Sequence, residues 1–207
     1  MKKMTPINHQ TRLILASSSI YRQQLLSRLQ LPFEVIAPDI DETALPNETP
    51  SSTAQRLALQ KAQTVAKLAP GAIVIGSDQV ATLNNMVIGK PNTHQNALKQ
   101  LQMMRGKEVI FHTALCVYQD RLPTPFIQED DVQTMVTFRD LPDIELEAYL
   151  RIEQPYDCAG SAKNEGLGIA ILERVESTDP TALTGLPLIA LTSMLRQTGV
   201  LFFRPNC

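Results

Sequence analysis

Short apolar runs alternate with longer segments of helical periodicity along this chain, and this alternation restricts the fold more than any other feature. The runs typical of strands are 13–16, 33–36, 72–76, 80–83, 86–88, 109–118, 132–138 and 166–172. The segments with helical spacing are 20–29, 52–68, 93–104, 144–152 and 187–196. This alternation predicts an α/β fold, and a hairpin turn at Asn84-Asn85 adds antiparallel pairing. We therefore expect a central mixed β-sheet flanked by helices.

The sequence shows no boundary between independent domains. Its 207 residues suit one domain, and 43% apolar residues are enough for a sizeable core. The sequence contains no clean linker and no internal repeat. We therefore expect a single domain over residues 1–207, with two lobes around a cleft.

Composition excludes several classes of protein. The net charge of -2 argues against a protein that binds nucleic-acid polymers, and 5% aromatic residues without Trp argue against a base-stacking platform. The three cysteines are far apart and form no Cys-x-x-Cys pair, which argues against a disulfide framework and a zinc site. No stretch approaches the ~18 apolar residues of a membrane helix. We expect a cytoplasmic protein without membrane contact.

A serine-rich turn follows the first apolar run and precedes the first helix. Ser17, Ser18 and Ser19 occupy the turn, and Arg22 falls in the first helical turn. Free N–H groups at a helix N-terminus attract phosphate, and the forked guanidinium of arginine suits phosphate oxygens. The turn thus predicts a phosphate-binding element. The alternative is an ordinary serine cap beside a solvated arginine.

Two acidic segments supply candidate carboxylates. Asp39, Asp41 and Glu42 lie in a polar loop, and Asp78 follows the apolar run that starts at Ala72. A carboxylate at the end of a buried strand sits where α/β folds place ligands. Carboxylates from two loops suit a magnesium ion that also binds phosphates. The alternative for the loop is a set of solvated charges.

Three lysines complete the candidate set. Lys61 falls on the apolar side of the helix predicted at 52–68, where lysine is rarely buried unless it is paired. It is therefore a candidate partner for phosphate or for a carboxylate such as Glu42; the alternative is a side chain that reaches solvent at the edge of that face. Lys90 and Lys163 lie in glycine-containing loops, where backbone N–H groups also reach a ligand.

Common nucleotide-site signatures are absent from the sequence. A P-loop that ends at Gly89-Lys90 requires glycine at position 84 and Ser or Thr at position 91, but Asn84 and Pro91 stand there. A dinucleotide fingerprint at Gly166 requires glycine where Ile171 stands, and no Gly-x-Ser-x-Gly elbow occurs. The sequence thus offers hydrogen-bond donors for phosphate, together with carboxylates, but no evident nucleophile–base pair. This combination favours metal-assisted attack of water on a phosphoanhydride.

These pieces, in this order, resemble the Maf-like nucleotide pyrophosphatases. The matching segments are Leu13-Ile14-Leu15-Ala16-Ser17-Ser18-Ser19 with Arg22, Asp41-Glu42-Thr43, Lys61-Ala62, Ile75-Gly76-Ser77-Asp78, Gly89-Lys90-Pro91, Cys158-Ala159-Gly160-Ser161, Glu165-Gly166-Leu167-Gly168 and Gly185-Leu186-Pro187. The resemblance leaves out residues 1–11 and 197–207. It implies an elongated α/β fold with a cleft between lobes. It also implies metal-dependent cleavage of a nucleoside triphosphate to monophosphate and pyrophosphate, with Mg²⁺ or Mn²⁺ as cofactor, and a homodimer.

The same resemblance implies roles for individual residues. Asp78 is similar to the proton acceptor that activates water, and the resemblance implies Glu42 and Asp78 as metal ligands. The residues implied around the phosphates are Ser19, Arg22, Glu42, Lys61 and Lys90. The chain departs from the family pattern at Ile20, where proline is usual. Because a proline at the first helical position takes no part in the chemistry, we expect isoleucine there to change only the rigidity of the start of the helix.

The residue types at three further positions resemble those of the family branch that acts on 7-methyl-GTP. These residues are Tyr21, Gln79 and Glu165. The methylated base carries positive charge, so an aromatic face attracts it by ~0.5–2 kcal/mol, and a carboxylate accepts charge-assisted hydrogen bonds from it. A core position for Tyr21 and a solvated Glu165 are the alternatives. For the protein, the alternatives are a pyrophosphatase for dTTP, UTP or other non-standard nucleotides, and a nucleotide-binding regulator of cell division.

Overall fold

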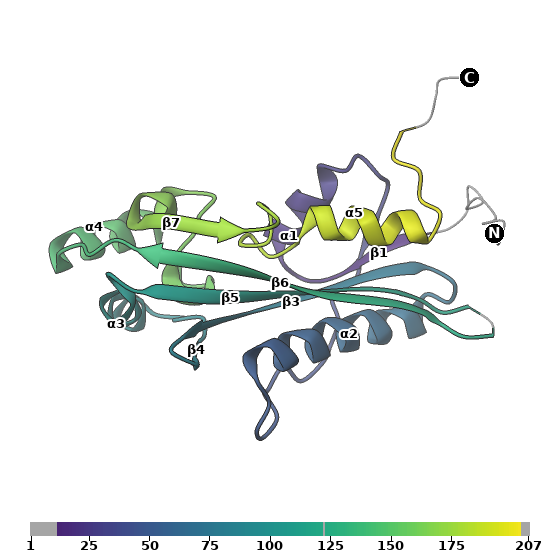
Figure 1. The fold of residues 1–207 in the computed structure, drawn as a ribbon, viewed down its shortest axis with the longest axis horizontal. Coiled ribbons are helices and arrows are strands. Elements are labelled where there is room, and N and C mark those ends of the chain that lie inside the picture. The colour runs from purple at the N-terminus through teal and green to yellow at the C-terminus, as the bar shows by residue number, and fades with distance from the viewer. Residues whose placement is uncertain (1–11, 122, 204–207) are drawn as a thin grey trace.

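Three long antiparallel strands run through the whole molecule and form the centre of its sheet (Figure 1). The computed structural model describes residues 12–121 and 123–203. The long strands are β3 (Ile73–Leu83), β5 (Glu108–Gln119) and β6 (Phe126–Phe138). The short strands are β1 (Leu13–Ala16), β2 (Glu34–Val35), β4 (Met86–Ile88) and β7 (Leu172–Ser177).

The sheet is mixed, as the sequence predicts. Its strand order is β2-β1-β3-β5-β6-β7, with β4 paired to β3 outside this path. β1 runs parallel to both β2 and β3, whereas all other pairs are antiparallel. The parallel part is therefore confined to the edge where the serine-rich turn leaves β1.

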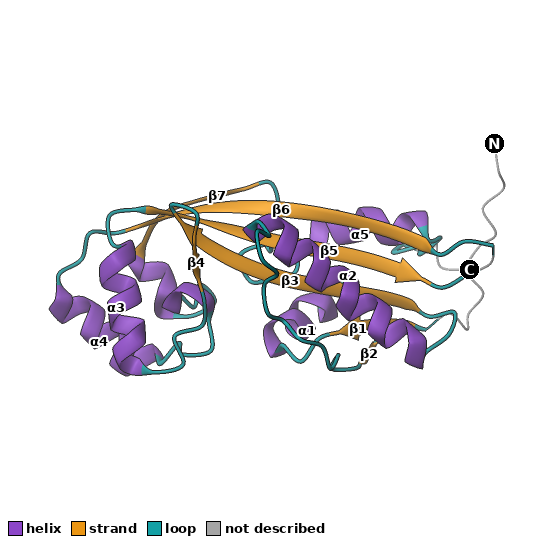
Figure 2. Ribbon diagram, turned by 90° about the horizontal axis from the view of Figure 1, so that it is seen from below, coloured by secondary structure: helices purple, strands orange, loops and turns teal. Residues whose placement is uncertain are grey.

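The helices gather at the two ends of the long strands and give the molecule an elongated shape (Figure 2). At one end, α2 (Pro50–Leu68) covers one face of the sheet, and α1 (Ile20–Ser27) and α5 (Leu188–Gln197) cover the other. At the other end lie α3 (His94–Met104), α4 (Asp143–Glu153) and two 3₁₀ helices, η1 (Ala159–Ser161) and η2 (Leu167–Ile171). No helix in the described residues is both long and apolar enough to cross a bilayer.

Gly76 lets α2 approach the sheet closely. A Cβ on Gly76 would lie 2.1 Å from the carbonyl oxygen of Ala58, so only glycine fits there. The sheet alternates its side chains, so Asp78 points toward the same face two residues later. Lys61 lies about one turn beyond Ala58 on the helix. This close contact therefore brings the ammonium of Lys61 to the carboxylate of Asp78.

The structure corrects three predicted strands. The runs predicted at 72–76 and 80–83 form one strand, β3, so Asp78 lies inside a strand rather than at its end. Asp78 and Gln79 interrupt the apolar pattern, but both side chains have hydrogen-bond partners in the fold. The strand predicted at 166–172 is mostly η2, because the amide of Gly168 turns back to the carbonyl of Lys163 at 3.0 Å; β7 follows it.

Other element bounds differ less. The strand predicted at 132–138 begins at Phe126 in the structure. The apolar pattern does not indicate this first part, because residues 128–131 are polar. The helix predicted at 20–29 ends at Ser27, and the strand predicted at 33–36 contains only Glu34 and Val35. The N-cap of α2 is Thr49, whose side chain accepts from the amide of Ser52. The remaining predicted elements match to within one residue at most ends.

Candidate active site

The serine-rich turn lies where β1 ends and α1 begins. Ser19 is the N-cap of α1, and its Oγ accepts a hydrogen bond from the amide of Arg22 at 3.4 Å. The amide of Ser19 donates to Oγ of Ser17 at 3.1 Å. The ordinary capping role of Ser19 is therefore present. The positive end of the α1 dipole faces the same place, as a phosphate site requires.

Lys61 joins two carboxylates from distant parts of the chain. Its Nζ lies 2.6 Å from Oδ1 of Asp78 and 2.7 Å from Oε1 of Glu42. Lys61 is 5% exposed and Asp78 is 7% exposed, whereas the Glu42 side chain is largely exposed. The pairing of Lys61 with Glu42 that the sequence suggested is confirmed, and Asp78 is a second partner. Three predicted site residues thus form one cluster.

Arg22 and Lys90 add positive charge around this cluster. Partial burial raises the pKa of Glu42, but the hydrogen bond and charge of Lys61, with the charges of Lys90 and Arg22, outweigh it and hold that pKa below its ordinary value. Burial lowers the pKa of Arg22, and the charges of Asp78 and Glu42 oppose that effect. The cluster therefore combines three cations with two carboxylates, a balance that favours a polyanionic ligand.

Arg22 is held by a main-chain carbonyl that sequence reasoning did not identify as a partner. Its Nε donates to the oxygen of Gly185 at 2.8 Å. Oγ of buried Ser77 lies 2.9 Å from the same oxygen and 2.8 Å from the oxygen of Ala114. Gly185 adopts φ +109°, in the region that favours glycine. The Gly-Leu-Pro segment that carries the family resemblance thus orients the guanidinium.

The turn that contains Gly185 is anchored by a buried acid that the sequence analysis missed. Oδ1 of Asp179 accepts from the amide and hydroxyl of Thr181 at 3.0 and 2.7 Å. Its Oδ2 accepts from the amide of Ile189, at the start of α5, at 2.6 Å. Asp-Pro-Thr at a loop before a helix is a turn and capping signal that was available in the sequence.

Gln79 follows Asp78 in β3, and its side chain faces the turn that contains Gly185. Its Nε2 lies 2.9 Å from Oγ1 of Thr113 and donates to the carbonyls of Ala182 and Leu183 at 3.1 and 3.0 Å. The amide nitrogen is therefore fully engaged within the protein. A direct contact of Gln79 with a base would have to use the amide oxygen.

Tyr21 and Glu165 each lie close enough to Cys158 to affect the pKa of its thiol. Burial raises the pKa of Tyr21, and neighbouring Cys158 and Asp157 raise it further. Burial likewise raises the pKa of Cys158 to about 12, with contributions from the charges of Asp157 and Glu165. The thiol therefore stays protonated. Cys158 therefore lies near both Tyr21 of α1 and Glu165.

The loop after Cys158 is shaped by tight packing. Lys163 pairs with Glu153 of α4 at 2.8 Å, so its ammonium is engaged by a carboxylate. A Cβ on Gly166 would lie 2.6 Å from the Glu153 carboxylate, and one on Gly168 would lie 2.4 Å from the carbonyl of Lys163. The two glycines thus allow the chain that carries Glu165 to fold against α4. Glu165 itself is exposed.

The donor set fits a divalent cation that is shared with phosphates. The carboxylates of Glu42 and Asp78 both bind Nζ of Lys61, at 2.7 and 2.6 Å, so the two acids lie close to each other. Mg²⁺ typically takes one or two carboxylates and completes its shell with waters and substrate phosphates. Over the described residues, no cluster of three or more His, Cys, Asp or Glu suited to a metal occurs. The geometry therefore suits a cation bound together with nucleotide.

Two surface hollows lie away from these residues. One, of about 380 Å³, is lined by Thr82 to Asn85 and residues of β5, and the other, of about 400 Å³, lies between α3 and α4 around His94 and Glu147. Neither contains a predicted site residue. The cleft between the two lobes therefore stays a prediction.

Comparison with known proteins agrees with the residue pattern. A model of the family described as Maf-like protein matches residues 12–198. A "7-methyl-GTP pyrophosphatase" of Cupriavidus metallidurans is 64% identical over 187 residues, 90% of this chain and 93% of that protein. One of Burkholderia pseudomallei is 61% identical over 195 residues, 93% of this chain and 90% of that protein. Among solved structures, the Staphylococcus aureus Ham1 protein aligns with 63% of this chain and 73% of its own at 13% identity, with a TM-score of 0.42.

Proposed function

Because this chain belongs to the Maf-like protein family, we propose that it is a nucleotide pyrophosphatase that hydrolyses 7-methyl-GTP to 7-methyl-GMP and pyrophosphate. Relatives that carry this enzyme name are 61% and 64% identical over about nine-tenths of the chain. The observation that carries the chemistry is the contact of Lys61 with both Asp78 and Glu42, beside Arg22. A homodimer, which the family resemblance implies, and a cytoplasmic location, which the composition favours, are part of the proposal.

The cations of the site bind the triphosphate. Arg22 is oriented through its Nε, which leaves its terminal nitrogens to face phosphate oxygens. Lys90 is exposed and close enough to Glu42 to affect its pKa. The N-terminus of α1 adds backbone N–H groups after the Ser19 cap. Together these groups hold the α-phosphorus beside Asp78.

Asp78 accepts the proton of the attacking water. Its Oδ1 is fixed by the 2.6 Å contact with Lys61, so Oδ2 is the atom that receives the proton. Water attacks the α-phosphorus, the bond from that phosphorus to the bridging oxygen breaks, and pyrophosphate leaves with the bond electrons. A buried, oriented carboxylate is suited to this role because it needs no reorganisation during the reaction.

Glu42 would hold the divalent cation, Mg²⁺ or Mn²⁺, while Asp78, which keeps Oδ2 for the proton, would lie beside it. When bound, such an ion neutralises phosphate charge and stabilises the leaving pyrophosphate. Glu42 is the more accessible of the two acids, and its depressed pKa keeps it ionised and ready to bind a cation. Lys61 holds Asp78 throughout the reaction and holds Glu42 until the cation binds.

Tyr21 and Glu165 would recognise the methylated base. The ring of Tyr21 offers a π-face to the cationic base, and the carboxylate of Glu165 accepts from its N–H groups. Both residues lie around Cys158, which supports a shared pocket. Gln79 would contribute to base recognition indirectly, because its amide holds the turn at Ala182 and Leu183.

Pyrophosphate release from a panel of nucleoside triphosphates tests the proposal. The panel contains 7-methyl-GTP, GTP, dTTP and UTP, with Mg²⁺, with Mn²⁺ and with chelator. Preference for 7-methyl-GTP that disappears with chelator is the expected result. Equal or better use of dTTP or UTP would overturn the substrate, and nucleotide binding without any turnover would instead support a regulator.

A further inference from the structure

Glu42 lies in a segment that has no helix or strand to hold it. Residues 36–49 connect β2 to α2, and most of their side chains are exposed. A loop of this length with few buried contacts is free to move unless specific bonds fix it. A cation ligand on such a loop requires a second group that orders the main chain around it.

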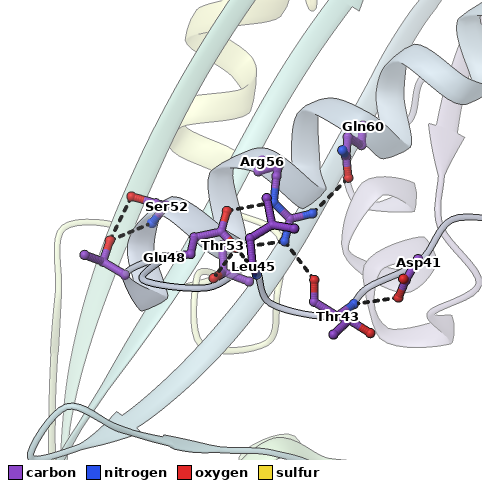
Figure 3. A network of polar contacts seen from close by, with 9 residues as sticks. Asp41, Thr43, Leu45, Glu48, Ser52, Thr53, Arg56 and Gln60 are labelled. Carbon is purple, nitrogen blue, oxygen red and sulfur yellow. Dashed lines mark hydrogen bonds and ion pairs between the residues drawn. The ribbon is translucent and has the colours of Figure 1, made fainter.

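Arg56 of α2 supplies this order through Glu48. Its Nε and Nη2 donate to the two carboxylate oxygens of Glu48 at 2.7 and 2.8 Å, in the forked arrangement (Figure 3). The side chains are only 19% and 10% exposed. Glu48 also accepts from the amide of Leu45 at 2.9 Å and from Oγ1 of Thr53 at 3.0 Å. This pair is therefore a built junction between the loop and the helix.

The same guanidinium reaches the residue that follows Glu42. Nη2 of Arg56 donates to the carbonyl oxygen of Thr43 at 3.1 Å. The amide of Thr43 donates to Oδ1 of Asp41 at 2.9 Å, so Asp41 and Arg56 fix the main chain beside Glu42. Lys61, on the same helix, binds the Glu42 side chain. Helix α2 thus holds Glu42 at two points, through the carbonyl of the next residue and through the Glu42 carboxylate.

We propose that Arg56 and Glu48 are positioning residues that hold Glu42 in place for the divalent cation of the nucleotide complex. This inference rests on the proposed function, because it takes Glu42 as the cation's carboxylate. Arg56 and Glu48 do not themselves contact phosphate or cation in this arrangement; they act through the main chain at Thr43. Once the cation competes with Lys61 for Glu42, the Arg56 contact is the remaining tether on this acid.

The test is Mn²⁺ binding, followed by electron paramagnetic resonance, to the protein saturated with an analogue of 7-methyl-GTP whose α- and β-phosphorus atoms are joined by methylene. Arg56→Lys keeps the charge but loses the fork, and Glu48→Gln keeps the shape but loses the charge. In both variants we expect the Mn²⁺ concentration for half-saturation to rise by about tenfold. Calorimetry in chelator is expected to show analogue affinity within about twofold of wild type.

A matched control is available at the far end of the molecule. Arg105 pairs with Asp143 at 2.6 Å and with the carbonyl of Leu141 at 3.3 Å, so it also joins a carboxylate and a main-chain oxygen. Arg105→Lys is expected to leave Mn²⁺ half-saturation unchanged. Wild-type half-saturation in both Arg56→Lys and Glu48→Gln would overturn the inference. So would an equal loss of analogue affinity in chelator, which would indicate general damage.

The design separates this inference from the proposed function. If wild-type protein binds Mn²⁺ with the analogue but releases no pyrophosphate from any triphosphate, the proposed function fails and the binding comparison still decides the role of Arg56. If turnover is present and the variants bind Mn²⁺ as wild type does, only the inference fails. Circular dichroism at the assay temperature shows whether each variant is folded, and the Glu48→Gln variant decides if Arg56→Lys is not.

Discussion

Lys61 is the residue that makes the acids of this site compatible with burial. Its ammonium is nearly inaccessible and contacts both Asp78 and Glu42. A buried charge is costly without a partner, so an isolated Asp78 inside β3 would be strongly destabilising. The ion pair therefore has a structural and a chemical role at once. It allows a carboxylate in the middle of a buried strand and fixes which of its oxygens meets water.

Replacement of Asp78 by asparagine separates these two roles. Asp78→Asn retains an oxygen that accepts from Lys61, so we expect the folded protein to persist with a small shift in Tm. Asn takes no proton from water, so turnover is expected to fall by about 100- to 10,000-fold, the usual contribution of a general base. Pyrophosphate release and thermal unfolding measure the two effects. A near-wild-type rate would refute the assignment of Asp78.

Tyr21 carries the argument for substrate choice. Tyr21→Arg replaces a π-face with a cation, which repels a cationic base and removes an attraction of ~0.5–2 kcal/mol. We expect kcat/KM for 7-methyl-GTP to fall by at least about tenfold relative to that for dTTP. The comparison of the two substrates in one preparation is the measurement. An equal loss on both would mean that Tyr21 acts through folding or phosphate binding.

At the scale of elements, the contact between α2 and β3 sets the spacing of the whole cluster. Gly76→Ala places a Cβ against the carbonyl of Ala58, and a backbone atom cannot rotate away. We expect the helix to shift or the protein to lose about 1–3 kcal/mol or more of stability, as in overpacked cores. Gly89→Ala is the control, since a Cβ there meets nothing within 4 Å. Equal urea midpoints for the two variants would contradict this account.

Much of the element order was predictable because its periodicity is local. The helix at α2 and the strand at β1 show clear apolar patterns with turn or cap residues beside them. The extent of β3 was not predictable, because Asp78 and Gln79 interrupt the pattern and their partners are distant in sequence. Likewise η2 is set by a turn back to Lys163, which periodicity does not report.

The site divides in the same way. Ser19 and Arg22 follow a strand–turn–helix pattern, and Lys61 on an apolar helix face demanded a partner. Those residues could be proposed from local signals. The contacts of Arg22 with the carbonyl of Gly185 and of Arg56 with the loop could not be proposed in this way. Both end on main-chain oxygens, which every residue type has, and neither follows a periodic pattern in the sequence.

At the scale of the whole molecule, the site depends on long-range order rather than on one motif. The acids come from a loop and a strand, the cations from two helices and a loop, and the residues proposed to bind the base from α1 and the loop after Cys158. Any change that loosens one end is therefore expected to affect the site. Global stability, and its dependence on pH, is the property that reports this coupling.

Glu48 gives this dependence a defined direction. The hydrogen bonds from Arg56, with those from Leu45 and Thr53, lower the pKa of Glu48 from an ordinary value of 4.5 to about 2. Since the folded state holds this carboxylate ionised, the stabilisation is complete above pH 4.5 and is lost as the pH falls toward 2. Glu48→Gln has no titrating group there, so it lacks this contribution at every pH.

We therefore expect the difference in unfolding free energy between wild type and Glu48→Gln to be largest above about pH 5 and to shrink as the pH falls toward 3. Urea unfolding of both proteins at half-unit intervals from pH 6 to about pH 3 measures it. All other acids titrate alike in the two proteins, so their contributions cancel in the difference. A difference that stays constant with pH would mean that the carboxylate charge of Glu48 does not stabilise the fold, and that the junction with Arg56 contributes only through its shape.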